Sequence, residues 1–294
     1  MPKLLAKKKT KNTKTILKKE INENWFSAQV IITLSIMFTS VQILGIYVAK
    51  QLISFGLSQP MFGTDINDVT SAIYLFISIM ISTAIILILI KFRRTKKLLL
   101  LFEAMAIFST CTIVLTTIFP TNDLLVLLVA LAILAWRYTH RQSVLFRDFV
   151  SLIAVAGAGA YIGISFGLIP ILAFIIILAI YDIIAVFYTK HMVEIGKQSV
   201  GNNYAFTIAI PTKKHTFELG NGDLVIPLAV ASSIIANGPF MNNGLIAGLC
   251  LTASFVGLLA SIYTVSIKKI PLPALPPQTA LIIIVLLIGI FLKL

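Results

Sequence analysis

The chain has 294 residues, of which 58% are hydrophobic and 12% are charged, and its mean hydropathy is +0.98. This composition is too apolar for a soluble globular protein and predicts a polytopic membrane protein. The formal net charge of +13 would suggest nucleic-acid binding in a soluble protein, but here Lys and Arg cluster in the short connections between apolar runs. We therefore expect no nucleic-acid partner.

The N-terminal segment, residues 1–24, contains eight lysines. It is expected to form a basic cytoplasmic tail that lies against anionic lipid headgroups. The apolar run that follows, residues 25–49, is longer than the core of a signal peptide and lacks a convincing small-residue cleavage site. It is therefore expected to be a retained first span.

Eight further apolar runs have the character of membrane spans. Together with the first, they predict an all-α polytopic membrane protein with nine transmembrane helices. Residues 25–188 would hold helices one to six, residues 189–219 a cytoplasmic loop, and residues 220–294 helices seven to nine. The eight expected spans are 69–90, 98–119, 124–136, 149–166, 168–188, 223–237, 244–265 and 274–292.

The distribution of basic residues tests this count independently of hydropathy. If the N-terminus is cytoplasmic, 22 of the 24 Lys and Arg fall in cytoplasmic segments, and only Lys50 and Lys293 fall elsewhere. The outer connections carry Asp65, Asp68 and Asp123 instead. This asymmetry supports both the nine spans and the cytoplasmic N-terminus.

Some unusual residues within the spans have structural explanations. Glu103 lies about a turn and a half after Lys97, so we expect it to reach the inner headgroups or to pair with a basic neighbour. Three glycines of the fifth span, Gly157, Gly159 and Gly163, are expected to allow close helix packing.

Two carboxylates in the second half of the chain call for a functional explanation. Asp182 lies within the apolar run 168–188, eight residues before Lys190 and thus about 12 Å of helix rise from the inner boundary. Asp223 lies at the start of the next span and enters the membrane from the same side. Because an ionisable group costs roughly 2.5–3.5 kcal/mol at a helix centre, it is expected to have a partner. Consecutive antiparallel helices would make these two acids each other's partner.

A proline-rich segment, residues 268–277, precedes the ninth span on the same side. Its four prolines must interrupt helical hydrogen bonding. Irregular backbone at membrane depth is tolerated only where it is buried in protein or lines a cavity. We therefore expect this segment to lie beside the two acids.

These stretches resemble three motifs of the presenilin and signal peptide peptidase family of intramembrane aspartyl proteases. Tyr181-Asp182 resembles the YD motif, Gly220-Asn221-Gly222-Asp223 the GxGD motif and Pro273-Ala274-Leu275 the PAL motif, on spans six, seven and nine as in the family. The cytoplasmic N-terminus resembles an archaeal or bacterial-type presenilin homologue more than signal peptide peptidase. The resemblance implies that Asp182 and Asp223 are catalytic, and that the substrate is positioned by Tyr181, Gly220, Gly222, Pro273, Ala274 and Leu275.

The chemistry of two carboxylates supports the same function. Two facing carboxylates in a low-dielectric site cannot both ionise easily, so they share a proton, and one acts as general base on a water while the other acts as general acid. We expect an aspartic endopeptidase of the cell membrane that hydrolyses peptide bonds within transmembrane segments, with no cofactor and no metal. Its expected partners are transmembrane peptide substrates and the lipid bilayer, and a homo-oligomer is compatible with the sequence.

Two alternatives remain open at this point. Asp182 and Asp223 would suit the ion- or proton-coupling site of a secondary transporter, although no internal repeat is visible and both acids lie near one face. They would also suit a buried pair that only fixes helix packing, although acids in lipid are costly for that purpose.

The loop before Asp223 contains one further pattern. Residues 204–210 are rich in aromatic and β-branched side chains, follow Gly201-Asn202-Asn203 and end before Pro211, which predicts a short strand. The strand would either pack on the inner face of the helices or pair with an unwound substrate. The resemblance favours pairing, since it implies that a substrate is held as part of a small sheet, as in presenilin.

Overall fold

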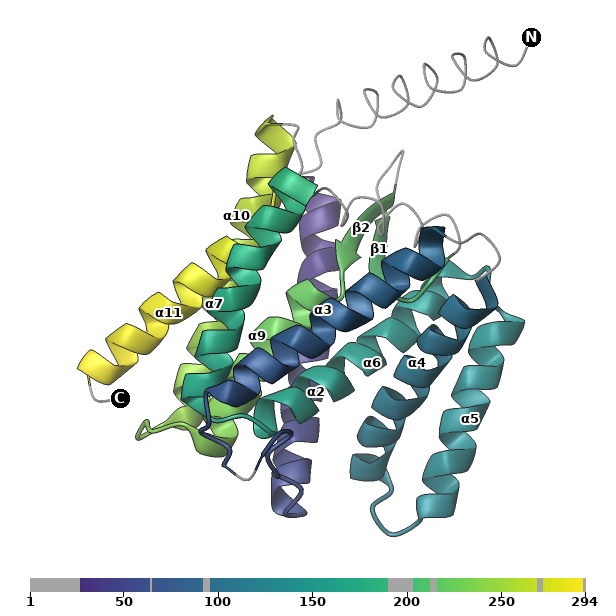
Figure 1. Cartoon of the computed structure of the whole chain (residues 1–294), viewed down its shortest axis with the longest axis horizontal. Coiled ribbons are helices and arrows are strands. Elements are labelled where there is room, and N and C mark those ends of the chain that lie inside the picture. The colour runs from purple at the N-terminus through teal and green to yellow at the C-terminus, as the bar shows by residue number, and fades with distance from the viewer. Residues whose placement is uncertain are drawn as a thin grey trace.

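The computed structural model describes residues 27–63, 65–91, 96–189, 203–211, 216–268 and 272–292. Within these ranges the chain forms nine α-helices and one two-stranded sheet, which confirms the expected fold class (Figure 1). The expected basic tail, residues 1–24, lies outside the described residues. The elements are α2 Ala28–Ser54, α3 Thr70–Lys91, α4 Lys96–Ile118, α5 Asp123–Thr139, α6 Val144–Ile164, α7 Leu168–Ile184, the π-helix η2 Ala185–Thr189, β1 Thr207–Pro211, β2 Thr216–Gly220, α9 Gly222–Asn237, α10 Asn243–Lys268 and α11 Leu275–Phe291.

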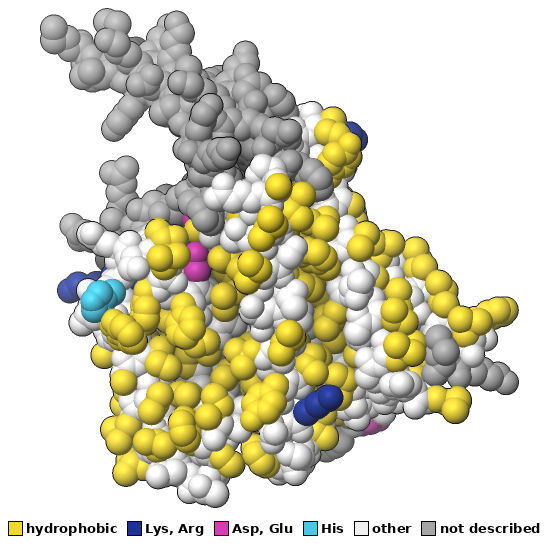
Figure 2. Space-filling model, turned by 180° about the vertical axis from the view of Figure 1, so that it is seen from behind, with side chains coloured by type: hydrophobic (Ala, Val, Ile, Leu, Met, Phe, Trp, Pro, Cys, Tyr) yellow, Lys and Arg dark blue, Asp and Glu magenta, His cyan; other side chains and the backbone are white. Residues whose placement is uncertain are grey.

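The lengths and surfaces of the helices are those of a multi-pass membrane protein. Helices α2, α4, α6, α7 with η2, and α10 are long and apolar enough to cross a membrane, and α3, α9 and α11 are shorter apolar helices. Large hydrophobic side chains are exposed on many helices, for example Ile43 at 67% and Leu287 at 61%. Figure 2 shows hydrophobic side chains spread over one face of the molecule, with few charged ones among them. Such a surface fits lipid better than water.

Helix α9 is central to the fold, because it packs against α2, α6, α7 and α10. Glycines of α6 allow this close approach. A Cβ at Gly163 would lie 2.3 Å from the carbonyl oxygen of Ala229, and one at Gly159 would lie 2.7 Å from a methyl group of Leu228. On the other side of α6, a Cβ at Gly157 would lie 2.4 Å from the carbonyl oxygen of Thr110 in α4. The packing role expected for these glycines is confirmed.

Strands β1 and β2 form an antiparallel hairpin at one end of the bundle (Figure 1). Ile208 lies opposite Leu219, and both are buried in a core cluster to which α2, α9 and α10 also contribute. The expected strand exists but begins three residues later than predicted, because residues 204–206 do not belong to the ladder. The second strand, β2, begins within residues 189–219, for which the sequence predicts a loop without this strand.

Of the two alternatives left open for residues 204–210, the hairpin favours packing on the helices over pairing with a substrate. One edge of β1 is occupied by β2. On the other edge, the backbone N–H of Ala209 donates to Oδ1 of Asp148 in α6 at 3.1 Å. Backbone groups of successive residues in an antiparallel strand point to alternate sides. Strand β1 thus makes hydrogen bonds to β2 on one edge and to Asp148 on the other. The outer edge of the hairpin belongs to β2.

Candidate active site

Asp182 lies near the end of α7, where this helix packs against α3, α9 and α11. Three residues after Asp182 the chain continues as the π-helix η2, a feature that is frequent at functional sites. The ring of the preceding residue, Tyr181, packs edge-to-face with Phe76 of α3, with the ring centroids 5.8 Å apart. The side chains of Tyr181 and Asp182 are half-buried, so the Asp182 carboxylate lies neither in the core nor fully on the surface.

The PAL segment contacts this carboxylate through its backbone. The N–H of Leu275 donates to Oδ2 of Asp182 at 3.2 Å, and the N–H of Ala274 lies near the same carboxylate. Ala274 is the N-cap of α11 and Leu275 its first residue. The first N–H groups of a helix have no partner within the helix and carry its positive dipole end, so they are suited to bind an anion. Pro273 directly precedes this pair.

Asp223 is the second residue of α9, which packs against α7. Its carboxylate lies within electrostatic range of Asp182. Gly220 lies beside it, since a Cβ at this glycine would be 3.6 Å from Oδ2 of Asp223. Four residues further along α9, Pro227 has no N–H, so the carbonyl of Asp223 lacks its intrahelical donor.

The turn between β2 and α9 is fixed by Asn221, the variable residue of the GxGD motif, for which the sequence predicts no role. Its backbone N–H donates to the carbonyl oxygen of Phe206 at 3.3 Å, and its side-chain Nδ2 donates to that of Ala205 at 2.9 Å. The two residues before β1 therefore hold the turn that leads to Asp223.

A cavity of about 240 Å³ lies beside these residues, lined by α3, α6, α7, α9 and the start of α11. Its lining is apolar except for Thr83, Tyr181 and Asp182. Gly222 and Leu275 also line it, whereas Asp223 lies beside it, between the lining residues Gly222 and Val225. The cavity thus brings an apolar space next to a carboxylate, as a site for an apolar peptide segment requires.

Buried charges form two further clusters that the sequence analysis did not find. Glu103 is 2% exposed, and its Oε1 accepts from Arg137 of α5 and from the backbone N–H of Ala205, both at 3.0 Å. Of the two alternatives expected for Glu103, the structure shows pairing with a basic residue, Arg137 of the neighbouring helix α5, and not contact with the headgroups. The second cluster joins Arg147 and Asp148 of α6 to Glu218 of β2.

The arrangement has the parts that acid–base chemistry needs. It holds two half-buried carboxylates near each other, a backbone N–H that donates to one of them, and an apolar cavity alongside. Among the described residues, no group of three or more His, Cys, Asp or Glu side chains is arranged to hold a metal ion.

Comparisons with known proteins agree with this arrangement. The family described as signal-peptide peptidase, presenilin aspartyl protease matches residues 34–293. A solved structure of a presenilin-family intramembrane aspartate protease is similar, with a TM-score of 0.67 and 21% identity over 89% of this chain and 99% of that one. A second crystal form of such a protease gives a TM-score of 0.62 and 21% identity, over 92% and 100% of the two chains. No match was found among curated protein sequences.

Proposed function

Because the chain belongs to the signal-peptide peptidase and presenilin aspartyl protease family, we propose that it hydrolyses peptide bonds within transmembrane segments with Asp182 and Asp223 as its catalytic pair. One observation carries this proposal. Asp182 on α7 lies beside an apolar cavity. Its neighbours there are Asp223 at the start of α9 and the PAL residues at the start of α11. The family is one of intramembrane aspartyl proteases, which makes a transporter the weaker explanation of the two acids.

In the proposed mechanism the two carboxylates share one proton. The ionised one takes a proton from a water molecule, the water attacks the scissile carbonyl, and the protonated one donates to the leaving nitrogen. The N–H of Leu275 holds Oδ2 of Asp182, and the other carboxylate oxygen would act on the reacting atoms. Pro273, Ala274 and Leu275 have no acid–base side chain and therefore act by shaping the site.

The hairpin supports a way to hold an unwound substrate. Ala209 lies opposite Glu218 and directs its N–H away from β2, so these two residues form a non-hydrogen-bonded pair. The backbone groups of Glu218, and of Gly220 two residues later, therefore point to the outer edge of β2. An extended peptide that pairs with this edge would run towards Asp223, which follows Gly220 by three residues. Gly220 and Gly222 would leave room for the substrate backbone beside the acid.

The positive-inside rule gives the proposed orientation, with the N-terminus in the cytoplasm and a cell membrane as the location. In that orientation the hairpin and both acids belong to the inner side. The scissile bond would then lie in the inner half of the substrate helix, after local unwinding of that helix.

Cleavage of a transmembrane reporter peptide in proteoliposomes tests the proposal. Asp182→Asn and Asp223→Asn should each abolish cleavage, because either change removes one half of the acid–base pair. Asp123→Asn, which changes the first residue of α5 at the other end of the bundle, serves as control and should cleave at the rate of the unchanged protein. Substantial cleavage by either of the first two variants would remove the assignment.

A further inference from the structure

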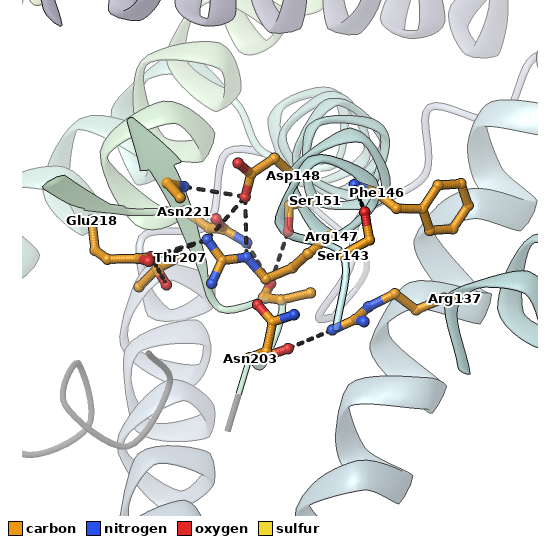
Figure 3. Close-up of polar contacts among 12 residues, drawn as sticks. Arg137, Ser143, Phe146, Arg147, Asp148, Ser151, Asn203, Thr207, Glu218 and Asn221 are labelled. Carbon is orange, nitrogen blue, oxygen red and sulfur yellow. Dashed lines mark hydrogen bonds and ion pairs between the residues drawn. The ribbon is translucent and has the colours of Figure 1, made fainter. Parts of the chain in front are cut away.

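The second buried charge cluster is built around Arg147 and lies beside the hairpin (Figure 3). Arg147 and Asp148 are the fourth and fifth residues of α6 and are only 2% and 4% exposed. Charges in a membrane protein are costly to bury and are retained where they have partners and a role. The catalytic chemistry proposed above uses neither residue, so their burial needs another explanation.

The cluster joins α6 to both strands of the hairpin. Nε and Nη2 of Arg147 each donate to Oδ1 of Asp148 at 3.0 Å, and Nη2 also reaches the Glu218 carboxylate at 3.2 Å. Asp148 in turn accepts the backbone N–H of Ala209 in β1. Thr207 donates its hydroxyl to Oε2 of Glu218 at 2.6 Å. Arg147 therefore holds β2 directly, and it holds β1 through Asp148.

The position of β2 determines the position of Asp223. Glu218 precedes Asp223 by only five residues, and the turn between them is held by the hydrogen bonds of Asn221 to the segment before β1. Ser151, one turn after Arg147 on α6, donates to the carbonyl oxygen of Ala205, which Nδ2 of Asn221 also contacts. A rigid-body shift of the hairpin relative to α6 would therefore move the start of α9.

Stability alone does not explain such a cluster. Replacing a buried ion network by apolar or neutral groups is often neutral for stability, whereas removing one member leaves a buried charge without a partner. A catalytic group, by contrast, must be held closely, because a displacement of about 1 Å can lower a rate about 100-fold.

We propose that Arg147 is a positioning residue, which places the outer edge of β2 and the carboxylate of Asp223 through Glu218 and Asp148. This inference rests on the proposed function, since it assigns Arg147 to the same site. Arg147 does not touch the reacting atoms; it acts through the strand that precedes them.

The test compares three purified variants in proteoliposomes for kcat, KM and thermal stability. Arg147→Met keeps much of the side-chain volume and removes the charge; it should lower kcat at least about tenfold and also lower the melting temperature. The triple variant Arg147→Met, Asp148→Asn, Glu218→Gln leaves no buried charge unpaired. It should recover most of the melting temperature while kcat stays low, because the strand is no longer held in place.

Ser233→Ala is the matched control. It removes another buried hydrogen bond of α9, from Ser233 to the carbonyl oxygen of Phe166 at 2.7 Å, ten residues after Asp223. It should leave kcat within about twofold of the unchanged protein. Recovery of kcat together with stability in the triple variant, or normal turnover by Arg147→Met, would overturn the positioning role. Asp223→Asn is measured alongside, and cleavage by that variant would instead refute the proposed function.

Discussion

The hydrogen bond from Leu275 to Asp182 gives the sharpest prediction. Replacing Leu275 by its α-hydroxy analogue turns the amide into an ester and removes the N–H, while the leucine side chain stays. A hydrogen bond to a charged group contributes about 1.5–3 kcal/mol. The N–H of Ala274 remains near the same carboxylate, so we expect a loss near the lower limit. At about 1.4 kcal/mol for each factor of ten, kcat should fall about tenfold.

The assay is cleavage of a fluorogenic transmembrane peptide in proteoliposomes, with kcat and KM determined separately. KM should change little, because the bond orients an acid and does not contact the substrate. The same analogue at Leu287 is the control; it removes an N–H inside α11, far along the helix from Asp182, and should leave kcat within about twofold. If the analogue at position 275 turned over as fast as this control, the PAL backbone would not hold Asp182 in the working enzyme.

Three further predictions concern the substrate, the PAL segment and the helix packing. Product ends mapped by mass spectrometry should lie in the inner half of a substrate span, and a helix-breaking proline placed there should speed cleavage; cuts confined to the outer half would contradict the orientation. Ala274→Trp should abolish cleavage, because a large ring would fill the space beside Asp182; unchanged turnover would separate α11 from the site. Gly163→Ala should cost about 1–3 kcal/mol of stability, since its Cβ would lie 2.3 Å from the carbonyl oxygen of Ala229. Gly248→Ala, where a Cβ meets nothing within 4 Å, should instead stabilise by about 0.5–1 kcal/mol, and equal melting temperatures of the two variants would refute the packing argument.

The helices could be predicted from the sequence because a span needs about 20 apolar residues, and this requirement is local. Errors arose where a helix carries charges. Helix α6 begins at Val144, five residues before the expected start, because Arg147 and Asp148 interrupt the apolar run. Their partner Glu218 lies 71 residues from Arg147, and no local pattern reveals a contact at that separation.

The same limit applies to the candidate site. The motifs predicted that Asp182 and the PAL residues would lie near each other, and the structure confirms this proximity through the bond from Leu275. Strand β2 was missed because its alternation of polar and apolar residues spans only Thr216 to Leu219, too short to separate from a loop. For Glu103 the sequence predicted a basic partner as one of two alternatives but could not identify it, since only the folded chain brings Arg137 and the backbone of Ala205 to it.

The catalytic pairing of Asp182 with Asp223 is tested most directly by the binding of a transition-state analogue. A hydroxyethylene isostere of a cleaved peptide replaces the scissile amide with a carbon that bears a hydroxyl group, and this hydroxyl would lie between the two carboxylates. Transition-state analogues bind at least about 100-fold more tightly than substrates. We predict that Asp182→Asn and Asp223→Asn each lose most of this affinity in a competition assay, while a substrate peptide binds both as before. Undiminished binding of the isostere by either variant would contradict the paired mechanism.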